Sequence, residues 1–341
     1  MRSSQSDRPN VRGGRRELAA QPSLTGGSDL NPRVLVVGSI NMDLIARCKQ
    51  APREGETIHG EAFHTAPGGK GANQAVACAR LGAATRMVGR VGGDEFGRSL
   101  RLGLAENGVD VEHVGVDRET SSGVAVILLE ETGRNRIIVI SGANWRVGDE
   151  EVRAARDLLS QADVVLMQFE LPLAVVKAVA EAARESEVLS VLDAGAATPA
   201  AVEMGLPGLV DVISPNETEA ETLTGVDIHG LPEARRAAEV LREMGAGEVV
   251  LKLGEQGAYW LGPEGEGHFP AFPVEPVDTT AAGDAFTGCL SVALAGGAGM
   301  GEAIARANAA GALACLTLGA QPSMPTAAAV DAFLQAHGRQ S

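Results

Sequence analysis

The sequence predicts an α/β fold with a mostly parallel central sheet, helices on both faces of that sheet, and a small separate β-sheet. Short apolar runs such as 34–37 and 163–169 are typical of buried parallel strands. From about residue 149 onward such runs alternate with helical patterns, which is the order expected of helices layered on a parallel sheet. Aromatic residues make up only 3% of the chain and 43 residues are glycine, a composition that favours close packing of helices on a sheet.

Order is expected to begin after residues 1–32. This segment is rich in Arg, Ser, Gly and Gln without periodicity, so we expect a disordered leader followed by one domain over 33–338. The first predicted strand is 33–38. Asn41 and Asp43 follow at its carboxyl end, where α/β proteins bind ligands. Their side chains can hydrogen-bond vicinal hydroxyls, and an Asx turn without further role is the alternative.

A glycine-rich turn with the sequence GGKG, 68–71, opens the next predicted helix, 72–81. It lacks the first glycine and the hydroxyl residue of a Walker loop, but its glycines permit close approach of a ligand. Lys70 and Asn73 offer hydrogen-bond donors at the helix start, and a turn with one exposed lysine is the alternative. The segment 90–97 also lacks the dinucleotide G-x-G-x-x-G spacing, which weakens an oxidoreductase interpretation.

Two β-rich runs, 122–130 and 136–141, flank a turn-forming segment and predict a hairpin. With 57–65 they would form the small sheet, whose lid segments we place at about 47–66 and 120–141. The remaining predicted elements are helix 149–160, strand 163–169, helix 172–186, strands 188–193 and 210–214, helices 217–224 and 232–244, strand 248–253, and helices 285–295, 302–315 and 326–337.

Composition and charge exclude several classes of protein. The net charge is −15, which argues against a nucleic-acid binder because such a surface needs a basic footprint. No apolar run approaches the ~18 residues that a membrane-spanning helix requires. The four cysteines, Cys48, Cys78, Cys289 and Cys315, are scattered without a C-x-x-C pair, which is typical of buried thiols in a reducing compartment. We therefore expect a cytoplasmic protein with neither a nucleic-acid nor a membrane partner.

Polar residues directly follow several predicted strands. Glu170 places a carboxylate at the end of the run 163–169. Asn216 and Glu219 lie at the start of helix 217–224, where they can position Mg²⁺ together with water and phosphate oxygens; ordinary helix-capping residues are the alternative. The segment 252–257, KLGEQG, is a second strand-to-glycine turn, suited either to the phosphates of a nucleotide or to a hairpin.

The segment 278–286 is the most informative stretch of the chain. No residue of 279–283 has a large side chain, so its backbone N–H groups can approach a ligand closely, and at a helix N-terminus such groups bind anions. Asp284 stands beside them, where phosphoryl transfer to a hydroxyl needs a general base. A glycine-containing turn with Asp284 as a helix cap is the alternative.

Taken in order, these motifs resemble the ribokinase-like, phosphofructokinase-B-type family of carbohydrate kinases. The resemblance covers about 34–337 and rests on GSINMD (38–43), GGKGANQ (68–74), MQFE (167–170), PNETE (215–219), VDTTAAGD (277–284) and GAQPS (319–323). It implies a ribokinase-like fold and ATP-dependent phosphorylation of D-ribose at its 5-hydroxyl. A kinase for another sugar or a nucleoside, and a non-catalytic sugar-binding regulator, remain as alternatives.

The resemblance also implies a role for each matching residue. Asp284 would be the catalytic base, beside an anion hole made by Ala281, Ala282 and Gly283. The sugar would be held by Asn41, Asp43, Gly69, Lys70, Asn73, Glu170 and Asp284. ATP would lie along Asp193, Asn216, Lys252, Gly254, Gly257, Gly283 and Asn308. Mg²⁺ would be organised by Asn216 and Glu219, and K⁺ by Asp278, Thr280, Ala314, Thr317, Gly319 and Ser323. The lid would also form a homodimer interface.

The chain departs from the family pattern at two positions near the nucleotide. Many relatives read Asn-Pro-Ala-Pro-Ala after a strand where this chain has DAGAA, 193–197, so that Asp193 adds a negative charge. Lys252 stands where threonine is common, and its positive charge can compensate. Neither change touches Asp284 or the sugar-binding set.

Overall fold

The structure, a computed structural model, describes residues 31–338, so the predicted leader over 1–32 lies almost entirely outside the described residues. A nine-stranded sheet forms the centre of the molecule. Its strands, in spatial order, are β13 (Gly265–Phe269), β12 (Ala258–Gly262), β11 (Glu248–Lys252), β10 (Val212–Ser214), β9 (Leu189–Asp193), β8 (Val164–Gln168), β1 (Arg33–Val37), β4 (Ala84–Gly92) and β5 (Val114–Asp117). The strands from β11 to β5 run parallel, and β12 and β13 add an antiparallel hairpin at one edge.

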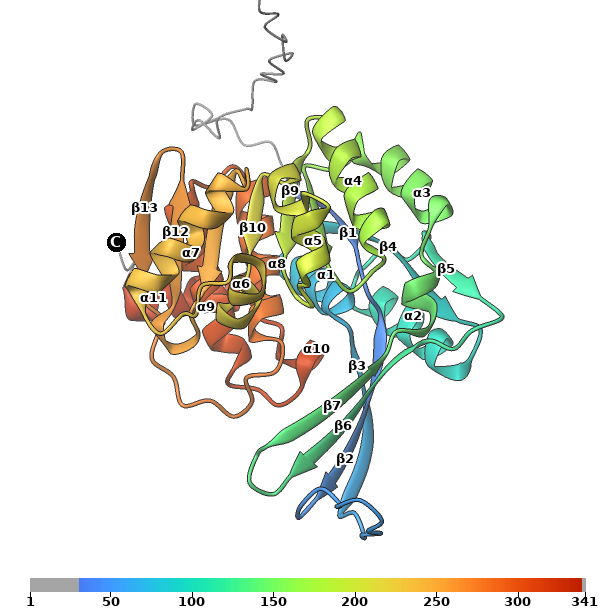
Figure 1. Cartoon of the computed structure of the whole chain (residues 1–341). Coiled ribbons are helices and arrows are strands. Elements are labelled where there is room, and N and C mark those ends of the chain that lie inside the picture. The colour runs from blue at the N-terminus through green and yellow to red at the C-terminus, as the bar shows by residue number, and fades with distance from the viewer. Residues whose placement is uncertain (1–30, 339–341) are drawn as a thin grey trace, which may run out of the picture.

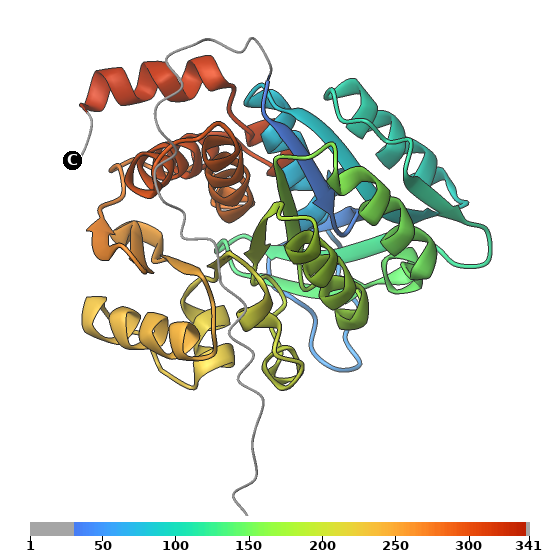
Figure 2. The same cartoon turned by 90° about the horizontal axis from the view of Figure 1, so that it is seen from above.

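Helices cover both faces of this sheet (Figures 1 and 2). One face carries α1 (Lys70–Arg80), α2 (Glu95–Glu106), α8 (Ala282–Ala295), α9 (Met300–Ala314) and α11 (Ala327–His337). The other carries α3 (Asp149–Leu159), α4 (Leu173–Glu185), α5 (Pro199–Glu203), α6 (Glu217–Thr224) and α7 (Leu231–Glu243). The short helices η1 (Gly142–Arg146), η2 (Leu206–Leu209), η3 (Gly254–Gln256) and α10 (Ala320–Ser323) lie in connections. The predicted mostly parallel α/β architecture is confirmed.

Strand β1 shows why the parallel strands are apolar without interruption. Val34 and Val36 belong to the core beneath α1, α8 and α9, whereas Leu35 and Val37 belong to the core beneath α3 and α4. Side chains alternate between the faces of a strand, so a strand covered on both sides buries every side chain. Burial of each is worth about 1.5–3 kcal/mol. A polar side chain in such a strand is buried and therefore needs hydrogen-bond partners within the protein.

A second sheet projects from the body, and we call it the lid (Figure 1). Its strands, in spatial order, are β3 (Ala62–Gly68), β2 (Asn41–Cys48), β6 (Gly123–Glu130) and β7 (Asn135–Ile140). The predicted hairpin is confirmed, because β6 and β7 pair antiparallel. The small sheet starts earlier than expected, because β2 begins at Asn41, in the segment for which an Asx turn was the alternative. Pairing with both β3 and β6 along its length holds this segment extended.

The outer strand of the lid exposes apolar side chains. Every residue of β7 is exposed, including Ile137 at 53%, Ile138 at 64% and Val139 at 57%. Phe63 of β3 is also exposed, at 66%. An edge strand of this kind offers unpaired backbone groups and apolar area to a partner.

Several elements were absent from the sequence prediction: β4, α2, β5, and the β12–β13 hairpin. In β4 the apolar pattern is interrupted by glycines and by Arg90, whose guanidinium pairs with Glu151 at 2.5 Å and Glu150 at 2.7 Å. Such long-range partners cannot be read from a local pattern. Within 31–338, no helix combines the length and apolar character needed to cross a bilayer.

Candidate active site

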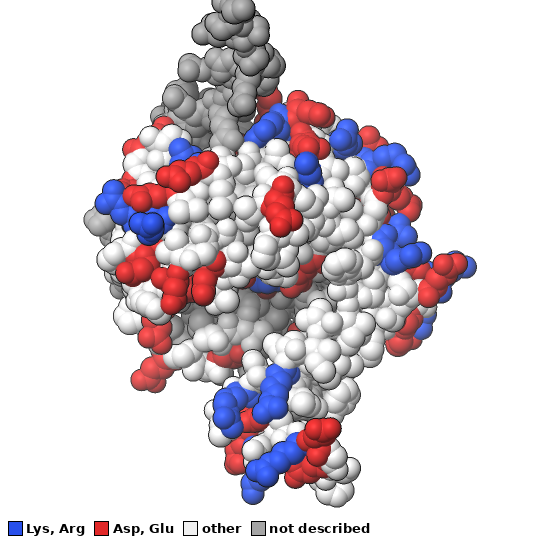
Figure 3. All heavy atoms as spheres, in the orientation of Figure 1, with Lys and Arg blue, Asp and Glu red and all other residues white. Residues whose placement is uncertain are grey.

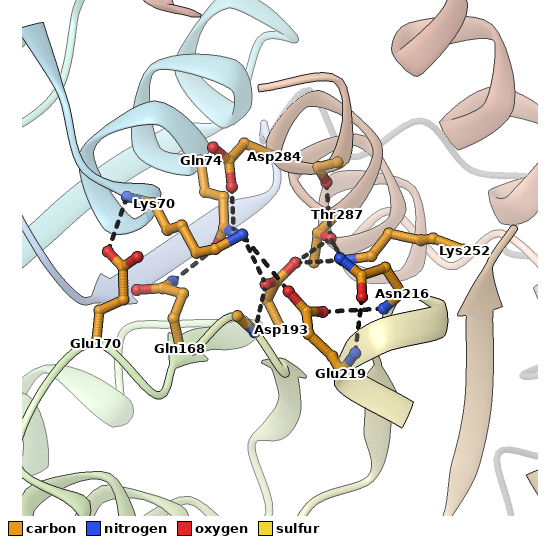
Figure 4. A network of polar contacts seen from close by, with 12 residues as sticks. Lys70, Gln74, Gln168, Glu170, Asp193, Asn216, Glu219, Lys252, Asp284 and Thr287 are labelled. Atoms are coloured by element: carbon orange, nitrogen blue, oxygen red, sulfur yellow. Dashed lines mark hydrogen bonds and ion pairs between the residues drawn. The ribbon is translucent and has the colours of Figure 1, made fainter. Parts of the chain in front are cut away.

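The predicted site residues meet at one edge of the central sheet. The carboxyl ends of β1, β8, β9 and β11 approach the first turns of α1, α6 and α8 there (Figure 4). Strand β2 leads from this edge into the lid, and Figure 3 shows a hollow between body and lid. On the face drawn there, basic and acidic side chains are interspersed without a broad basic surface. The arrangement fits a small-molecule site covered by a lid.

Asp284 lies in the first turn of α8 and is only 5% exposed. Its Oδ2 accepts a hydrogen bond from Asn73 Nδ2 at 2.9 Å, and its Oδ1 accepts one from Gln74 Nε2 at 3.0 Å. Gln168 Nε2 donates to Gln74 Oε1 at 2.6 Å, which leaves the Gln74 amide nitrogen directed at Asp284. Burial raises the pKa of Asp284, and the nearby Lys70 ammonium partly opposes this. A fixed carboxylate with a raised pKa is suited to accept a proton.

Helix α8 begins at Ala282, inside the stretch predicted to bind an anion. Ala281 precedes it in the left-handed conformation, with φ of 60°, which is unfavourable for a residue with a Cβ atom. The Ala282 amide donates a hydrogen bond to the Thr279 carbonyl oxygen at 3.3 Å, so an anion would take its place. First-turn amides have no partners within the helix, and together with the dipole they favour an anion. Residues 281–283 thus lie beside Asp284, and anion binding there stays a prediction.

Three of the sugar candidates form a cluster of carboxylates on the lid side of the site. Asp43 of β2 lies near Glu170 and Asp284. Burial first, and then the charges of these two neighbours, raise the pKa of Asp43 to about 6. Asn41 lies at the start of the same strand, and its Oδ1 accepts a hydrogen bond from Asn144 Nδ2 at 2.7 Å. Asn144 also bonds the backbone of Ile40 in both directions, so that it anchors the passage from β1 to β2.

Glu170 is fixed by the segment that follows β1. Its Oε2 accepts hydrogen bonds from Ser39 Oγ at 2.5 Å and from the backbone amide of Lys70 at 3.4 Å. Glycine is required where the two segments touch: Gly69 has φ of 89°, and a Cβ atom there would lie 2.7 Å from the Asn41 amide nitrogen. The close approach brings α1 against the start of the lid.

Lys70 carries the positive charge at the centre of the site. Its Nζ lies 3.7 Å from Asp193 Oδ1 and 3.9 Å from Glu219 Oε1. Burial disfavours the charged ammonium, but Asp193, Asp284, Glu219 and Glu170 together outweigh this and raise the pKa of Lys70. The ammonium is therefore charged over the whole physiological range.

Asp193 and Lys252 form an ion pair on the predicted nucleotide side. Asp193 ends β9 and is completely buried, and its Oδ2 accepts a hydrogen bond from Lys252 Nζ at 2.6 Å. Thr287 Oγ1 lies 2.8 Å from the same oxygen, and the Gly195 amide donates to Oδ1 at 3.0 Å. Burial alone would raise the pKa of Asp193, but the ammonium groups of Lys252 and Lys70 hold it below its ordinary value.

Asn216 and Glu219 form a capping box at the start of α6. Asn216 Oδ1 accepts from the Glu219 amide at 2.8 Å, and Glu219 Oε2 accepts from the Asn216 amide at 2.9 Å. Capping is thus what the protein alone shows. In the described part of the chain, no group of three or more His, Cys, Asp or Glu residues is arranged to hold a metal ion. Mg²⁺ does not need one, because it binds through one or two carboxylates, waters and substrate phosphates.

The other nucleotide candidates lie around the β11–β12 turn. Gly254 and Gly257 have φ of 51° and 89°. A Cβ atom on Gly257 would lie 2.1 Å from the Phe269 carbonyl oxygen, so the turn itself explains this glycine. Asn308 Nδ2 donates to the carbonyl oxygens of Phe269 at 3.0 Å and Pro270 at 3.2 Å. Asn308 thus fastens α9 to the end of β13 and the segment after it, and contact of these residues with a nucleotide stays a prediction.

Asp278 joins the two segments predicted to bind K⁺. Its Oδ1 accepts from the Thr280 amide and its Oδ2 from the Gly319 amide, both at 2.9 Å. The Cys315 carbonyl accepts the amides of Val277 and Asp278. The remaining candidates lie in the same loop, where the Thr317 amide donates to the Ala314 carbonyl and Ser323 Oγ donates to the Ala320 carbonyl.

Five polar residues of the site were missing from the predicted set: Ser39, Gln74, Asn144, Gln168 and Thr287. Gln168 had a usable signal, because it is a lone amide within an otherwise apolar strand. Gln74 ends the glycine-rich motif 68–74, but the motif gave no sign of its role. Asn144 offers no signal of this kind, since η1 brings it to Ile40 from 104 positions away.

Comparison with known proteins adds to this geometry. The family model described as pfkB family carbohydrate kinase matches residues 31–327. A ribokinase of Haemophilus influenzae is 37% identical over 301 residues, covering 88% of this chain and 97% of that protein. A deoxyribokinase of Salmonella typhi is 36% identical over 258 residues, covering 76% and 84%. The structure of Arabidopsis thaliana ribokinase complexed with ribose and ATP superposes with a TM-score of 0.83 at 34% identity, covering 90% and 99%.

Proposed function

Since this chain belongs to the pfkB family of carbohydrate kinases, we propose that it is a ribokinase, which transfers the γ-phosphoryl group of ATP to the 5-hydroxyl of D-ribose. The observation that carries the proposal is Asp284, a buried carboxylate held by Asn73 and Gln74 at the N-terminus of α8. A carboxylate at this position can act as a base for a hydroxyl whose phosphoryl donor binds at the helix N-terminus. Ribokinase relatives and the likeness to a ribokinase complexed with ribose and ATP support the choice of substrates.

The chain's own residues supply the base and the positioning. Asp284 accepts the proton of the 5-hydroxyl as that oxygen forms its bond to phosphorus and the bond to the leaving oxygen of ADP breaks. General bases contribute ~10²–10⁴-fold. The other sugar contacts are proposed to come from Asn41, Asp43, Gly69, Lys70, Asn73 and Glu170.

Phosphoryl transfer depends chiefly on in-line positioning and charge neutralisation. The amides of Ala281, Ala282 and Gly283 donate to the transferred group, the Ala282 amide in exchange for its hydrogen bond to the Thr279 carbonyl oxygen. One such preorganised donor is worth about 3–4 kcal/mol. The nucleotide lies along Asn216, Lys252, Gly254, Gly257 and Asn308, with Asp193 behind them. Closure of the lid excludes water, which would otherwise hydrolyse ATP.

We propose that Asn216 and Glu219 organise Mg²⁺ through its water ligands, and the ion neutralises phosphate charge when bound. A carboxylate and an amide oxygen fit such an ion, and Glu219 Oε1 already lies 3.9 Å from the Lys70 ammonium. Glu219→Gln is expected to raise the Mg²⁺ concentration needed for half-maximal activity several-fold. Unchanged Mg²⁺ dependence in that variant would contradict this assignment.

We also propose that K⁺ binds between the segments joined by Asp278, and that it activates the enzyme better than Na⁺. Backbone carbonyl oxygens are suitable K⁺ ligands, and the segment 314–323 approaches the start of α8 through Asp278. A cation there would steady the turn that presents the 281–283 amides. Equal activity in potassium-free Tris buffer and in K⁺ buffer would refute the proposal.

The exposed apolar side chains of β7 and Phe63 support a homodimer formed through the lid. Sedimentation of wild type and of Ile138→Glu would test it, with the variant expected to dissociate.

The free thiols support a cytoplasmic location; they are Cys48, Cys78, Cys289 and Cys315. Fractionation of the source cells would check that assignment.

A coupled assay with D-ribose, 2-deoxyribose, fructose and adenosine tests the function. D-ribose is expected to give the highest kcat/KM. The deoxyribokinase relatives make 2-deoxyribose the specific second candidate. A higher kcat/KM for 2-deoxyribose, fructose or adenosine would retain the family but overturn ribose as the substrate. Absence of ATP consumption with every acceptor would favour a sugar-binding regulator.

A further inference from the structure

One buried carboxylate connects two lysines across the site (Figure 4). Asp193 Oδ1 lies 3.7 Å from Lys70 Nζ, and Asp193 Oδ2 accepts from Lys252 Nζ at 2.6 Å. The lysines come from different parts of the fold, one from the start of α1 and the other from the end of β11. The Lys70 ammonium also lies 3.9 Å from Glu219 Oε1 and feels the charge of Asp284, whereas Lys252 faces the start of α8 with Thr287.

The surroundings of Asp193 leave no oxygen for a ligand. A carboxylate has about four lone-pair directions. The Gly195 amide and Lys70 Nζ face Oδ1, while Lys252 Nζ and Thr287 Oγ1 face Oδ2. The residue is 0% exposed. A buried charge is tolerated when it is paired and hydrogen-bonded, and Asp193 meets both conditions through its neighbours. Its role is therefore to hold those neighbours.

Lys252 is placed to use its remaining hydrogen. An ammonium has three donors; one is given to Asp193 and a second is 3.4 Å from Thr287 Oγ1. A Cβ atom built on Gly283 would lie 3.9 Å from Lys252 Nζ, so the ammonium adjoins the first turn of α8. The side chain is 11% exposed, which keeps the charge in a poorly solvated position. An anion at the α8 N-terminus would meet the amides and this ammonium together.

We propose that Lys252 binds the γ-phosphate of ATP, and that Asp193 is a positioning residue that holds the ammonium beside Gly283. The inference rests on the proposed function and adds to it a second lysine on the side of the phosphoryl donor. The two oxygens of Asp193 hold the two ammonium groups apart, Lys70 at Oδ1 and Lys252 at Oδ2. Lys70 then neutralises charge near the acceptor oxygen, and Lys252 does so near the donor.

Nucleotide binding without sugar separates this role from a structural one. The variant is Lys252→Met, and the measurement is calorimetric binding of ADP and of an ATP analogue with nitrogen between the β- and γ-phosphorus atoms. Loss of a γ-phosphate contact is expected to raise the Kd of the analogue by roughly 10–100-fold, while the Kd of ADP changes by less than about 3-fold. Equal weakening of both nucleotides would overturn the proposal. Lys177→Met in α4 makes the same charge change away from the site and is the control.

A double-mutant cycle tests the part assigned to Asp193. In the wild-type background, Asp193→Asn is expected to weaken binding of the analogue by roughly tenfold. In the Lys252→Met background it should have almost no effect, because substitutions at residues that act as a unit do not have additive effects. Adding Asp193→Asn should also raise the Tm of the Lys252→Met variant. Without Lys252, the buried Asp193 charge has only the more distant Lys70 ammonium as a cationic partner. Additive losses would overturn the positioning role. Failure of wild type to phosphorylate D-ribose would count against the proposed substrate only, because these measurements contain no sugar.

Discussion

The side-chain nitrogen Nε2 of Gln74 lies 3.0 Å from Oδ1 of Asp284, and this contact sets both the direction and the basicity of the candidate base. A hydrogen bond donated to the ionised carboxylate stabilises that form, so it lowers the pKa that burial raises. The oxygen not engaged by Gln74 is held by Asn73. The base is thus restrained from α1, the helix that also carries Lys70.

Replacing Gln74 by methionine, which has a similar shape, should move the pH profile of the enzyme. Loss of the hydrogen bond to the ionised form raises the pKa of Asp284, and the base works only when ionised. The acidic limb of kcat/KM against pH is therefore expected at higher pH, with kcat lower by roughly tenfold. Gln161→Met, which removes an exposed partner of Arg86, is the control. An unmoved limb would show that Gln74 does not tune the base.

Asp284→Asn should abolish turnover while leaving sugar binding largely intact. The asparagine keeps the size of the side chain but cannot accept the proton of the hydroxyl, and general bases contribute ~10²–10⁴-fold. Steady-state kinetics give the loss in kcat, and calorimetry with D-ribose gives the binding. A variant that keeps more than about a tenth of the wild-type kcat would remove Asp284 from the role of base.

Asp43→Ala should raise the KM for D-ribose far more than the KM for ATP. Asp43 lies with Asn41 at the start of the lid, and its charged neighbours are Glu170 and Asp284. A site built to hydrogen-bond a hydroxyl rejects an analogue that lacks it, because its own polar groups are left unpaired. The preference for ribose over 2-deoxyribose should therefore narrow. Equal increases in both KM values would contradict a sugar contact.

Asp43 should also make the folded state less stable as pH rises. Its folded pKa of about 6 is above the ordinary value of 3.8, so the folded state binds the proton more tightly than the unfolded state. Stability contributed by this group falls as pH rises from about 4 to about 6 and stays lower above that range. Asp43→Asn should unfold with a free energy about 1–3 kcal/mol higher than wild type near pH 7.

Urea unfolding of both proteins across this pH range measures the effect. The difference is expected to vanish toward pH 4, where the wild-type carboxyl is also neutral. Asp227→Asn, at an exposed position, is the control and should show no such trend. A pH-independent difference between Asp43→Asn and wild type would mean that the ionisation of Asp43 is not its source.

Much of the site follows from the sequence because a general rule places the ends of parallel strands together. Glu170, Asn216 and Lys252 each follow a buried run, and the rule brought them to one edge without knowledge of the strand order. Asp284 followed from small residues at a helix start. These inferences about position use only neighbours in the chain and one general rule, and the roles of the residues stay predictions.

What escaped prediction depends on partners far away in the chain. Strand β2 is an example, since its first residues favour a turn locally and only the ladders with β3 and β6 make them extended. The Asp193–Lys252 pair is another example. The compensation of charge was predicted, but the burial of the carboxylate and its second ion pair, with Lys70, come from the packing of α1 and α8. Contacts of this kind need the three-dimensional structure.

The outer strand of the lid also affects how the protein behaves at high concentration. Ile137 to Ile140 are four consecutive β-branched residues on an open edge, and Arg136 is the only charged residue of β7. Uncovered strands of this composition recruit further strands, and charged residues beside them suppress that process. Arg136 is therefore expected to suppress fibrous aggregation through β7. Light scattering during storage should rise faster for Arg136→Val than for wild type, and covering of β7 by a partner would protect both.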